Sequence, residues 1–163
     1  MKKQVKIALV IVFAVIVGVL VFVNRNNSVN SAENSIAIVV NGESENFEFS
    51  TSNSDFAAFD AVMTKKNGES FDKNYGGIQL KNIFSQAGIG ISENTRISVV
   101  CSDNYSVSLT AEEVLKDGNV WLVSQENGQP LPEDSGNFML VITMDEFSTR
   151  WAKDIAQITV DEK

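Results

Sequence analysis

Cys101 is the residue of this sequence whose type is best suited to chemistry, because a thiolate is both a nucleophile and a soft metal ligand. It is the only cysteine, so no internal disulfide can form, and the chain has no histidine. Zinc or haem sites that need imidazole are therefore excluded, as is a Ser-His-Asp triad. Two interpretations stay open: a reactive thiol, or a small buried hydrophobe that ends the apolar run 97–101. No basic residue adjoins Cys101 to lower the pKa of its thiol, which favours the second.

The other candidates lie just after this cysteine and near the end of the chain. Asp103, Asn104 and Tyr105 could line a pocket, because loops on a rigid scaffold commonly carry function. Their alternative role is a turn, since Asp and Asn side chains hydrogen-bond to the local backbone. Arg150 and Trp151 are candidates to close the same pocket, although Trp151 could instead fill the core.

Two pairs of neighbouring acids are weaker candidates. Glu112 and Glu113 follow Thr110 in the pattern of a capping box, which indicates a helix start and a solvated helix face and not an acid/base pair. Asp145 and Glu146 could contribute to a weak cation site, but adjacent acids are common in loops. We therefore predict no catalytic residue and no metal ligand.

Short strands and short helices are expected to position these residues in a mixed α+β domain. Apolar residues that alternate or form short runs, bounded by turn signals, predict the strands. The strands are expected at residues 36–40, 45–49, 59–64, 96–101, 105–109, 120–123, 138–142 and 155–160. Turns are expected at 41–42, 65–68, 102–105 and 127–132, and both prolines of the chain rigidify the last of these.

Two helices and one helical turn are predicted between the strands. Apolar residues at mostly helical spacing predict a helix over 78–87 that packs on a sheet, with two flexible glycines before it and Gly88 as its C-cap. The capping box predicts a second, short helix that ends at 116–118. A short helical turn is expected over 52–58. Around Phe59, periodicity does not decide between strand and helix.

The N-terminal segment predicts a membrane anchor. Three lysines in residues 1–6 precede an uncharged apolar run at 7–23, and one arginine follows it, which places 1–6 in the cytoplasm and the remainder outside. A signal anchor and a signal peptide cleaved near Ala32 both give this pattern, and the length of the run favours the anchor. We expect a single-pass protein of the cell membrane, or a secreted one if cleaved. A polar linker at 24–35 would carry a domain at 36–163.

The residues beyond Ala32 are strongly acidic. Among them, 9 basic residues stand against 21 acidic ones, which gives a net charge of −12. Nucleic acids and anionic membrane surfaces require clustered positive charge, so we expect neither to bind this domain. The expected partners are the membrane, through the N-terminal helix, and a small-molecule ligand or a partner protein.

Four segments of the chain stand in an order that is typical of one protein family. They are residues 75–80 with 87–89 (Tyr-Gly-Gly-Ile-Gln-Leu and Ala-Gly-Ile), 102–106 (Ser-Asp-Asn-Tyr-Ser), 127–131 (Asn-Gly-Gln-Pro-Leu) and 149–160 (from Thr-Arg-Trp to Val). They resemble, in turn, the W/Y-x-G-V-P-L…A-G-V segment, the S-D-G-Y turn, the N-G-x-P-L turn and the V-K-W-x-x-x-I-x-V ending of the molybdopterin-binding oxidoreductase domain. That domain occurs in sulfite oxidases and their bacterial relatives.

The resemblance implies the mixed α+β sulfite-oxidase fold. In working members a cysteine thiolate ligates molybdenum, and basic side chains with a histidine help to hold the pterin phosphate. The ligand cysteine belongs on or just after the strand at 59–64, but residues 59–66 are Phe-Asp-Ala-Val-Met-Thr-Lys-Lys. Met63 is a poor substitute for a thiolate on a soft metal. Where the family has an arginine on a strand, residues 139–141 are Met-Leu-Val. Where it has a proline-glycine segment, residues 143–146 are Thr-Met-Asp-Glu.

We therefore predict a reduced member of the family without a cofactor, with molybdopterin possible by resemblance. Its predicted function is that of a membrane-anchored, extracytoplasmic, non-catalytic binding or accessory module. The alternatives are a molybdopterin-dependent oxidoreductase or electron-transfer component with unusual cofactor ligation, and a structural domain that binds no ligand. The residues predicted to line the old cofactor cleft are Cys101, Asp103, Asn104, Tyr105, Arg150 and Trp151.

Overall fold

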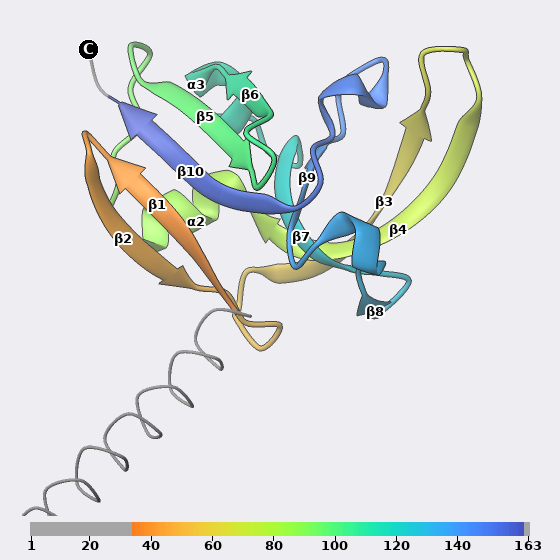
Figure 1. Ribbon diagram of the computed structural model, residues 1–163, viewed down its shortest axis with the longest axis horizontal. Helices are drawn as coiled ribbons and strands as arrows, with labels where there is room; N and C mark the ends of the chain where they lie inside the picture. Colours follow the sequence, from red (N-terminus) through yellow and green to blue (C-terminus); the bar gives the residue numbers. More distant parts are fainter. Residues whose placement is uncertain (1–33, 162–163) are drawn as a thin grey trace, which may run out of the picture. The chain divides into compact units, whose positions relative to one another are not determined.

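Ten strands form two five-stranded sheets in the computed structural model, which describes residues 34–161 (Figure 1). The first sheet has the order β2 (Glu43–Glu48), β1 (Ser35–Val40), β10 (Ile155–Asp161), β5 (Arg96–Cys101) and β6 (Ser106–Leu109). It is a mixed sheet, because β1 lies parallel to β10 while the other neighbours are antiparallel. The predicted mixed α+β class is confirmed.

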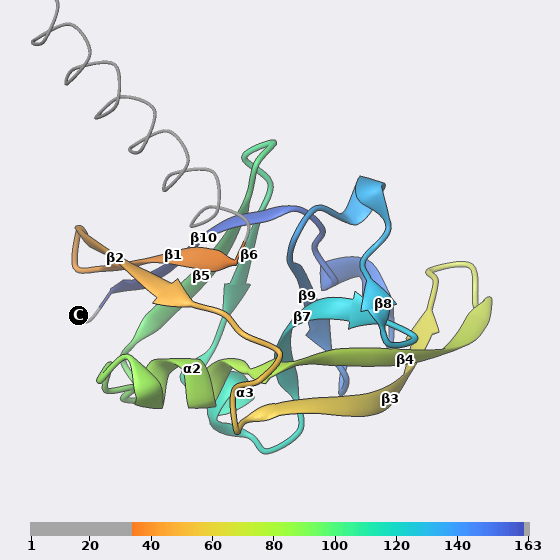
Figure 2. The ribbon, with the colours of Figure 1, turned by 90° about the horizontal axis from the view of Figure 1, so that it is seen from below.

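The second sheet is antiparallel throughout. It consists of β3 (Phe56–Thr64), β4 (Ser70–Gln79), β7 (Val120–Glu126), β8 (Gln129–Pro130) and β9 (Met139–Ile142). β4 pairs with β3 and β7, and both β8 and β9 pair with β7. Figure 2 shows β3 as the outermost strand of this sheet, with the turn of the β3–β4 hairpin at its periphery.

One hydrophobic cluster contains side chains of both sheets. Ile36, Val99 and Ile158 come from the first sheet and Ile78 and Leu122 from the second, and each is at most 1% exposed. Burying these side chains supplies the main favourable free energy of folding. In β1, β5 and β10 the apolar faces that the alternation predicted are therefore the faces that the strands bury, whereas β2 leaves nearly all its residues exposed.

The first helix, α2 (Leu80–Gln86), begins later than the helix predicted over 78–87. β4 continues through Ile78 and Gln79, which pair with Leu122 and Trp121 of β7. The stretch before the helix is therefore a paired strand, and the prediction of a flexible glycine link is wrong. The helix buries Leu80, Ile83 and Phe84 in the cluster, as predicted for a helix packed on a sheet.

α2 ends one residue earlier than predicted, so Ala87 is its C-cap and the predicted Gly88 follows that cap. Gly88 follows the helix with a φ of +70°, a conformation that glycine adopts without steric cost. The Gly88 amide donates to the Ser85 carbonyl at 3.2 Å, and the Ile89 amide donates to the Phe84 carbonyl at 2.8 Å. These two bonds form a Schellman motif, which satisfies carbonyls at the end of the helix.

β3 begins at Phe56, so the helical turn predicted over 52–58 is wrong in its second half. The Phe56 amide donates to the Asn53 carbonyl at 3.0 Å in the turn that precedes the strand. Phe56 then packs edge-on against Phe49, with ring centroids 6.2 Å apart. Phe59, for which periodicity gave no decision, lies in the strand and stacks on Trp121 at 4.1 Å.

The second helix, α3 (Ala111–Leu115), starts with the predicted capping box. The Glu113 amide donates to Thr110 Oγ1 at 3.1 Å, and the Thr110 amide donates to Glu113 Oε2 at 2.8 Å. Two single-turn 3-10 helices, η1 (Glu133–Ser135) and η2 (Ser148–Arg150), flank β9. The capping box leaves the other oxygen of Glu113 available for a distant partner.

The predicted membrane anchor at 7–23 lies outside the described residues, as does most of the linker at 24–35. None of the helices in residues 34–161 has the length and hydropathy that a membrane span requires. The predicted anchor therefore stays a prediction.

Candidate functional site

Cys101 ends β5, and its side chain is 5% exposed. Burial raises the pKa of the thiol, and the carboxylates of Asp103 and Asp154 raise it further. Nucleophilic attack and metal ligation both need the thiolate, which this environment disfavours. The geometry therefore supports the interpretation of Cys101 as a small buried hydrophobe.

Asp103, Asn104 and Tyr105 form the turn between β5 and β6. The Tyr105 amide donates to Asp103 Oδ1 at 2.9 Å, and Asn104 has a φ of +68°, which Asn tolerates better than most residues. The Tyr105 side chain is 48% exposed, and its hydroxyl donates to the Thr149 carbonyl at 3.5 Å. The predicted turn is confirmed, and it brings the β5–β6 loop next to η2.

Arg150 forms ion pairs with two carboxylates. Its Nη2 atom lies 2.7 Å from Glu113 Oε1, and its Nε atom lies 2.9 Å from Asp145 Oδ2. Burial acts to raise the pKa of Glu113, but the hydrogen bonds from Arg150 and Thr110 outweigh it and hold that pKa below its ordinary value. The guanidinium therefore ties α3 to the loop before η2, and its charge is already neutralised.

Trp151 fills the core, which is the second of the two roles predicted for it. It is 9% exposed, and its Nε1 atom donates to the Ile142 carbonyl at 2.9 Å. Its ring stands edge-on to Tyr75 with centroids 6.0 Å apart. The hydrogen bond satisfies the polar atom of a buried indole, so the position is explained by packing alone.

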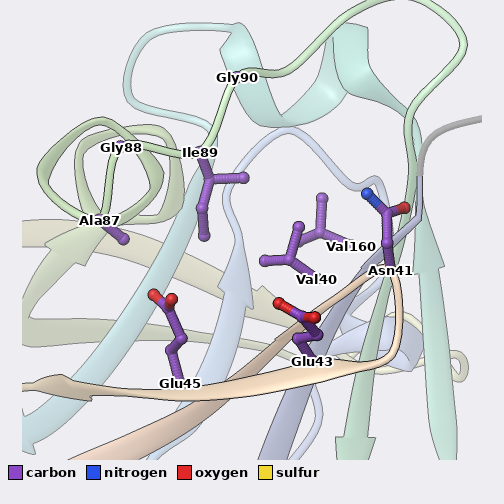
Figure 3. Close-up of a pocket in the computed structure, with 9 residues that line it drawn as sticks. All are labelled: Val40, Asn41, Glu43, Glu45, Ala87, Gly88, Ile89, Gly90 and Val160. Atoms are coloured by element: carbon purple, nitrogen blue, oxygen red, sulfur yellow. The ribbon is translucent and has the colours of Figure 1, made fainter.

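A cavity of about 420 Å³ opens between β2 and the loop that follows α2, and we call it the β2 cavity (Figure 3). Glu43 and Glu45 project into it from β2, opposite Ile89, and Val40 and Val160 form an apolar wall. None of the nine residues drawn around it is basic. The cavity thus places negative charge beside an apolar surface, which disfavours anions such as phosphates.

A second cavity, of about 630 Å³, lies at the β3–β4 hairpin, and we call it the hairpin cavity. β3 and β4 contribute three residues each, joined by one from the β7–β8 turn and one that follows β9. Lys73 is the only basic side chain among them, and its Nζ donates to Glu126 at 2.6 Å. The acidic members are Asp60 and Asp72, of which Asp60 accepts a hydrogen bond from Asn74 at 2.7 Å. The cavity therefore has both polar and apolar lining residues, and its one cation is already paired.

None of the six residues predicted to line a cleft lines either of these two cavities. The structure brings Cys101 and the 103–105 turn together and places Tyr105 against the backbone of η2. Arg150 and Trp151 are engaged with other groups, as described above. No group of three or more Cys, Asp or Glu side chains that could hold a metal ion occurs within residues 34–161.

The side chains that do line the cavities were not among the predicted site residues. Glu43 and Glu45 stand two residues apart on β2, a spacing that places both on one face, but the strand predicted at 45–49 included only the second of them. The opposite wall, at Ile89, comes from a loop more than 40 positions away. No local signal pairs these two segments.

The sequence of residues 35–163 matches the family model described as the oxidoreductase molybdopterin binding domain. Among solved structures, the chain is similar to the sulfane dehydrogenase SoxCD from Paracoccus pantotrophus, with a TM-score of 0.63 and 16% identity. The likeness covers 82% of this chain but only 39% of that chain, and at this identity it shows the fold alone. No curated protein matches the chain.

Proposed function

Because the chain belongs to the oxidoreductase molybdopterin-binding domain family, we propose that it is a non-catalytic member, in which the fold serves as the scaffold of a binding or accessory module. The observation that carries the proposal is the lack of a thiol at the hairpin cavity. Residues 59–66, where the family resemblance expects the molybdenum ligand, contain no cysteine, and residues 60–62 line the cavity. The polar groups there are carboxylates, amides, one hydroxyl and one paired lysine, whereas a soft metal prefers sulfur.

Cys101 is a poor replacement for that ligand. It ends β5 in the first sheet, whereas residues 59–64 belong to β3 in the second sheet. Its thiol is buried with a raised pKa, and metal binding requires the deprotonated form. The Cys101 thiol therefore lies in a different sheet from the expected ligand position, and it is not in the deprotonated form that a metal needs.

The charges oppose a phosphorylated pterin as well. Phosphate recognition relies on Arg and Lys side chains that are free to donate hydrogen bonds. Lys73 is bound to Glu126, and Arg150 is bound to Glu113 and Asp145. With a net charge of −12 beyond residue 32, an anionic cofactor would approach a repulsive surface. The residues present therefore do not fit the cofactor of the family.

The module is proposed to stand outside the cell membrane, held by residues 7–23. The support is the sequence pattern alone: an uncharged apolar run of membrane-spanning length, with three lysines before it and one arginine after it. The acidic domain has no affinity for anionic lipid surfaces by charge, so the apolar run would provide the attachment. A small-molecule ligand or a partner protein is the proposed binding partner.

Molybdenum and pterin analysis of the full-length chain tests the proposal. The chain would be purified in mild detergent from a host that makes molybdopterin, beside a catalytic molybdopterin enzyme produced in the same host as the control. We expect background molybdenum and pterin in this chain and stoichiometric amounts in the control. Stoichiometric molybdenum with pterin in this chain would overturn the proposal, and loss of that metal in Cys101→Ser would then identify the ligand.

A molybdopterin-dependent oxidoreductase or electron-transfer component is the second candidate, and membership of the family favours it. It requires cofactor ligation without the expected cysteine, so the same metal analysis decides between the two. A structural domain without any ligand is separated from a binding module by a thermal-shift screen, since a ligand that binds only the native state raises the melting temperature.

A further inference from the structure

The sheet edges in residues 34–161 are protected in different ways, with one exception. β2 carries glutamate at three of its six positions, β6 has four residues, and β8 has two, one of them proline. The outer side of β9 is bonded by the following segment, because the Leu140 amide donates to the Ala152 carbonyl at 2.7 Å. Charge, shortness, proline and coverage are the usual means by which proteins prevent unwanted strand pairing. Over most of its length β3 has only one of them, the single charge of Asp60.

β3 is nine residues long and contains one charged residue, Asp60, with no proline or glycine. Its partner β4 lies on one side only. At the hairpin end the Lys65 amide donates inward to the Glu69 carbonyl at 2.8 Å. Since inward and outward groups alternate along an antiparallel strand, Met63, Ala61 and the other odd-numbered residues bond to β4. The even-numbered residues direct their amides and carbonyls to the free side.

Two contacts confirm this assignment, and they mark the ends of the free stretch. Ser148 Oγ donates to the Thr64 carbonyl at 2.9 Å, and the Phe56 amide donates to the Asn53 carbonyl at 3.0 Å. Between them, the backbone groups of residues 58, 60 and 62 have no partner on the free side within the described residues. A row of unpaired amides and carbonyls of this kind is a template for an added strand.

The side chains beside this row have a specific pattern. Ala58, Asp60 and Val62 alternate with the inward residues, so they share one face, and all three are exposed, Val62 by 56%. Asn74 of β4 holds the Asp60 carboxylate through a bond of 2.7 Å, and Asp72 lies opposite Val62 in the register. The free edge therefore offers an apolar residue, a positioned carboxylate and a second apolar residue at two-residue spacing.

We propose that β3 binds an extended segment of a partner protein by strand addition. The partner strand would carry Lys or Arg opposite Asp60, with an apolar residue two positions to either side to contact Ala58 and Val62. Charge complementarity selects a basic segment over a second copy of this chain. Two copies would each bring a net charge of −12 beyond residue 32, and pairing centred on Asp60 would place two carboxylates face to face. The inference goes beyond the proposed function, because it holds whether or not the chain carries a cofactor.

Fluorescence anisotropy with labelled synthetic peptides tests the proposal on the full-length chain in detergent. The probe is an alternating heptapeptide, Thr-Val-Thr-Lys-Thr-Val-Thr, and the control peptide has Glu in place of Lys. We expect the Lys-centred peptide to bind about tenfold more tightly than the Glu-centred one. Asp60→Lys should reverse that preference. Equal affinity for the two peptides, no measurable binding of the Lys-centred one, or an unchanged preference in Asp60→Lys would overturn the proposal.

A backbone variant separates strand addition from simple charge attraction. Val62→Pro removes an amide that faces the free side, which an edge strand tolerates, and Val62→Thr is the matched control that keeps the amide. We expect the first to lose binding of the Lys-centred peptide and the second to keep it, with the melting temperature of both recorded as a check on folding. Retained binding in a folded Val62→Pro would overturn the proposal. A dimer in sedimentation that Val62→Pro abolishes would do the same, because it would assign the edge to a second copy.

Discussion

At the scale of single residues, position 77 requires glycine because β4 and β7 approach each other closely there. A Cβ atom there would lie 2.8 Å from the Val123 Cα, and closer still to the Leu122 carbonyl oxygen, so backbone would have to move. We expect Gly77→Ala to lower the free energy of unfolding by more than about 2 kcal/mol. Gly90→Ala is the matched control, since nothing lies within 4 Å of its added Cβ. Urea denaturation of both variants measures the effect, and equal unfolding midpoints would contradict the prediction.

Glu113 makes stability depend on pH. Its carboxylate serves both the capping box and Arg150, and its folded-state pKa lies below the ordinary value of 4.5. The ionised group therefore stabilises the fold above about pH 4.5, and this contribution is lost as the pH falls through the lowered folded-state pKa. We expect Glu113→Gln to lower the free energy of unfolding by about 1 kcal/mol at neutral pH. The difference should become progressively smaller as the pH falls below about 4.5.

Denaturation at several pH values measures this difference between Glu113→Gln and the unsubstituted chain. Glu112→Gln is the control, because its side chain is exposed at the neighbouring position of the same helix. A stability difference for Glu113→Gln that stays constant from neutral to acidic pH would show that the charge of this carboxylate is not responsible.

At the scale of elements, the end of α2 depends on one backbone conformation. Gly88 has a φ of +70°, and a side chain there would be strained even though no atom lies within 4 Å of an added Cβ. We expect Gly88→Ala to lower the free energy of unfolding by about 1 kcal/mol, and Gly90→Ala, two residues further on, to lower it by less. Hydrogen exchange should be faster at the Ile89 amide, which bonds to the Phe84 carbonyl. Unchanged exchange at Ile89 would mean that the Schellman motif does not depend on glycine.

The same elements show where local signals suffice. The capping box at Thr110 and the turn at Asn127-Gly128, with φ values of +52° and +70°, were predictable because the interacting groups lie within a few residues of each other. The start of α2 was not predictable in this way. Ile78 and Leu80 have the spacing of a helix face, but Ile78 is held in β4 by pairing with Leu122, more than 40 positions away.

At the scale of the whole molecule, the topology in the membrane is the prediction to test. Protease added to intact cells should degrade the acidic domain while a cytoplasmic marker stays intact, because the lysines before residues 7–23 favour the inside. Replacing Lys2, Lys3 and Lys6 with Glu should lower the fraction of chains whose N-terminus lies in the cytoplasm and whose acidic domain is accessible to the protease. Mass spectrometry of the purified chain distinguishes the anchored form from a form cleaved near Ala32. A domain that stays intact until cells are lysed would contradict the prediction.

The sequence by itself determined the chemical limits of this protein: one cysteine, no histidine, an acidic domain and an apolar N-terminal run. It also determined most strands, because alternation records which face of a strand is buried. Tertiary structure alone decided what covers each face. The pairing of Arg150 with Glu113 spans 37 positions, the two walls of the β2 cavity come from distant segments, and the free side of β3 follows from its place in the sheet. Contacts between residues far apart in the chain leave no periodic signal, so only the folded arrangement assigns them.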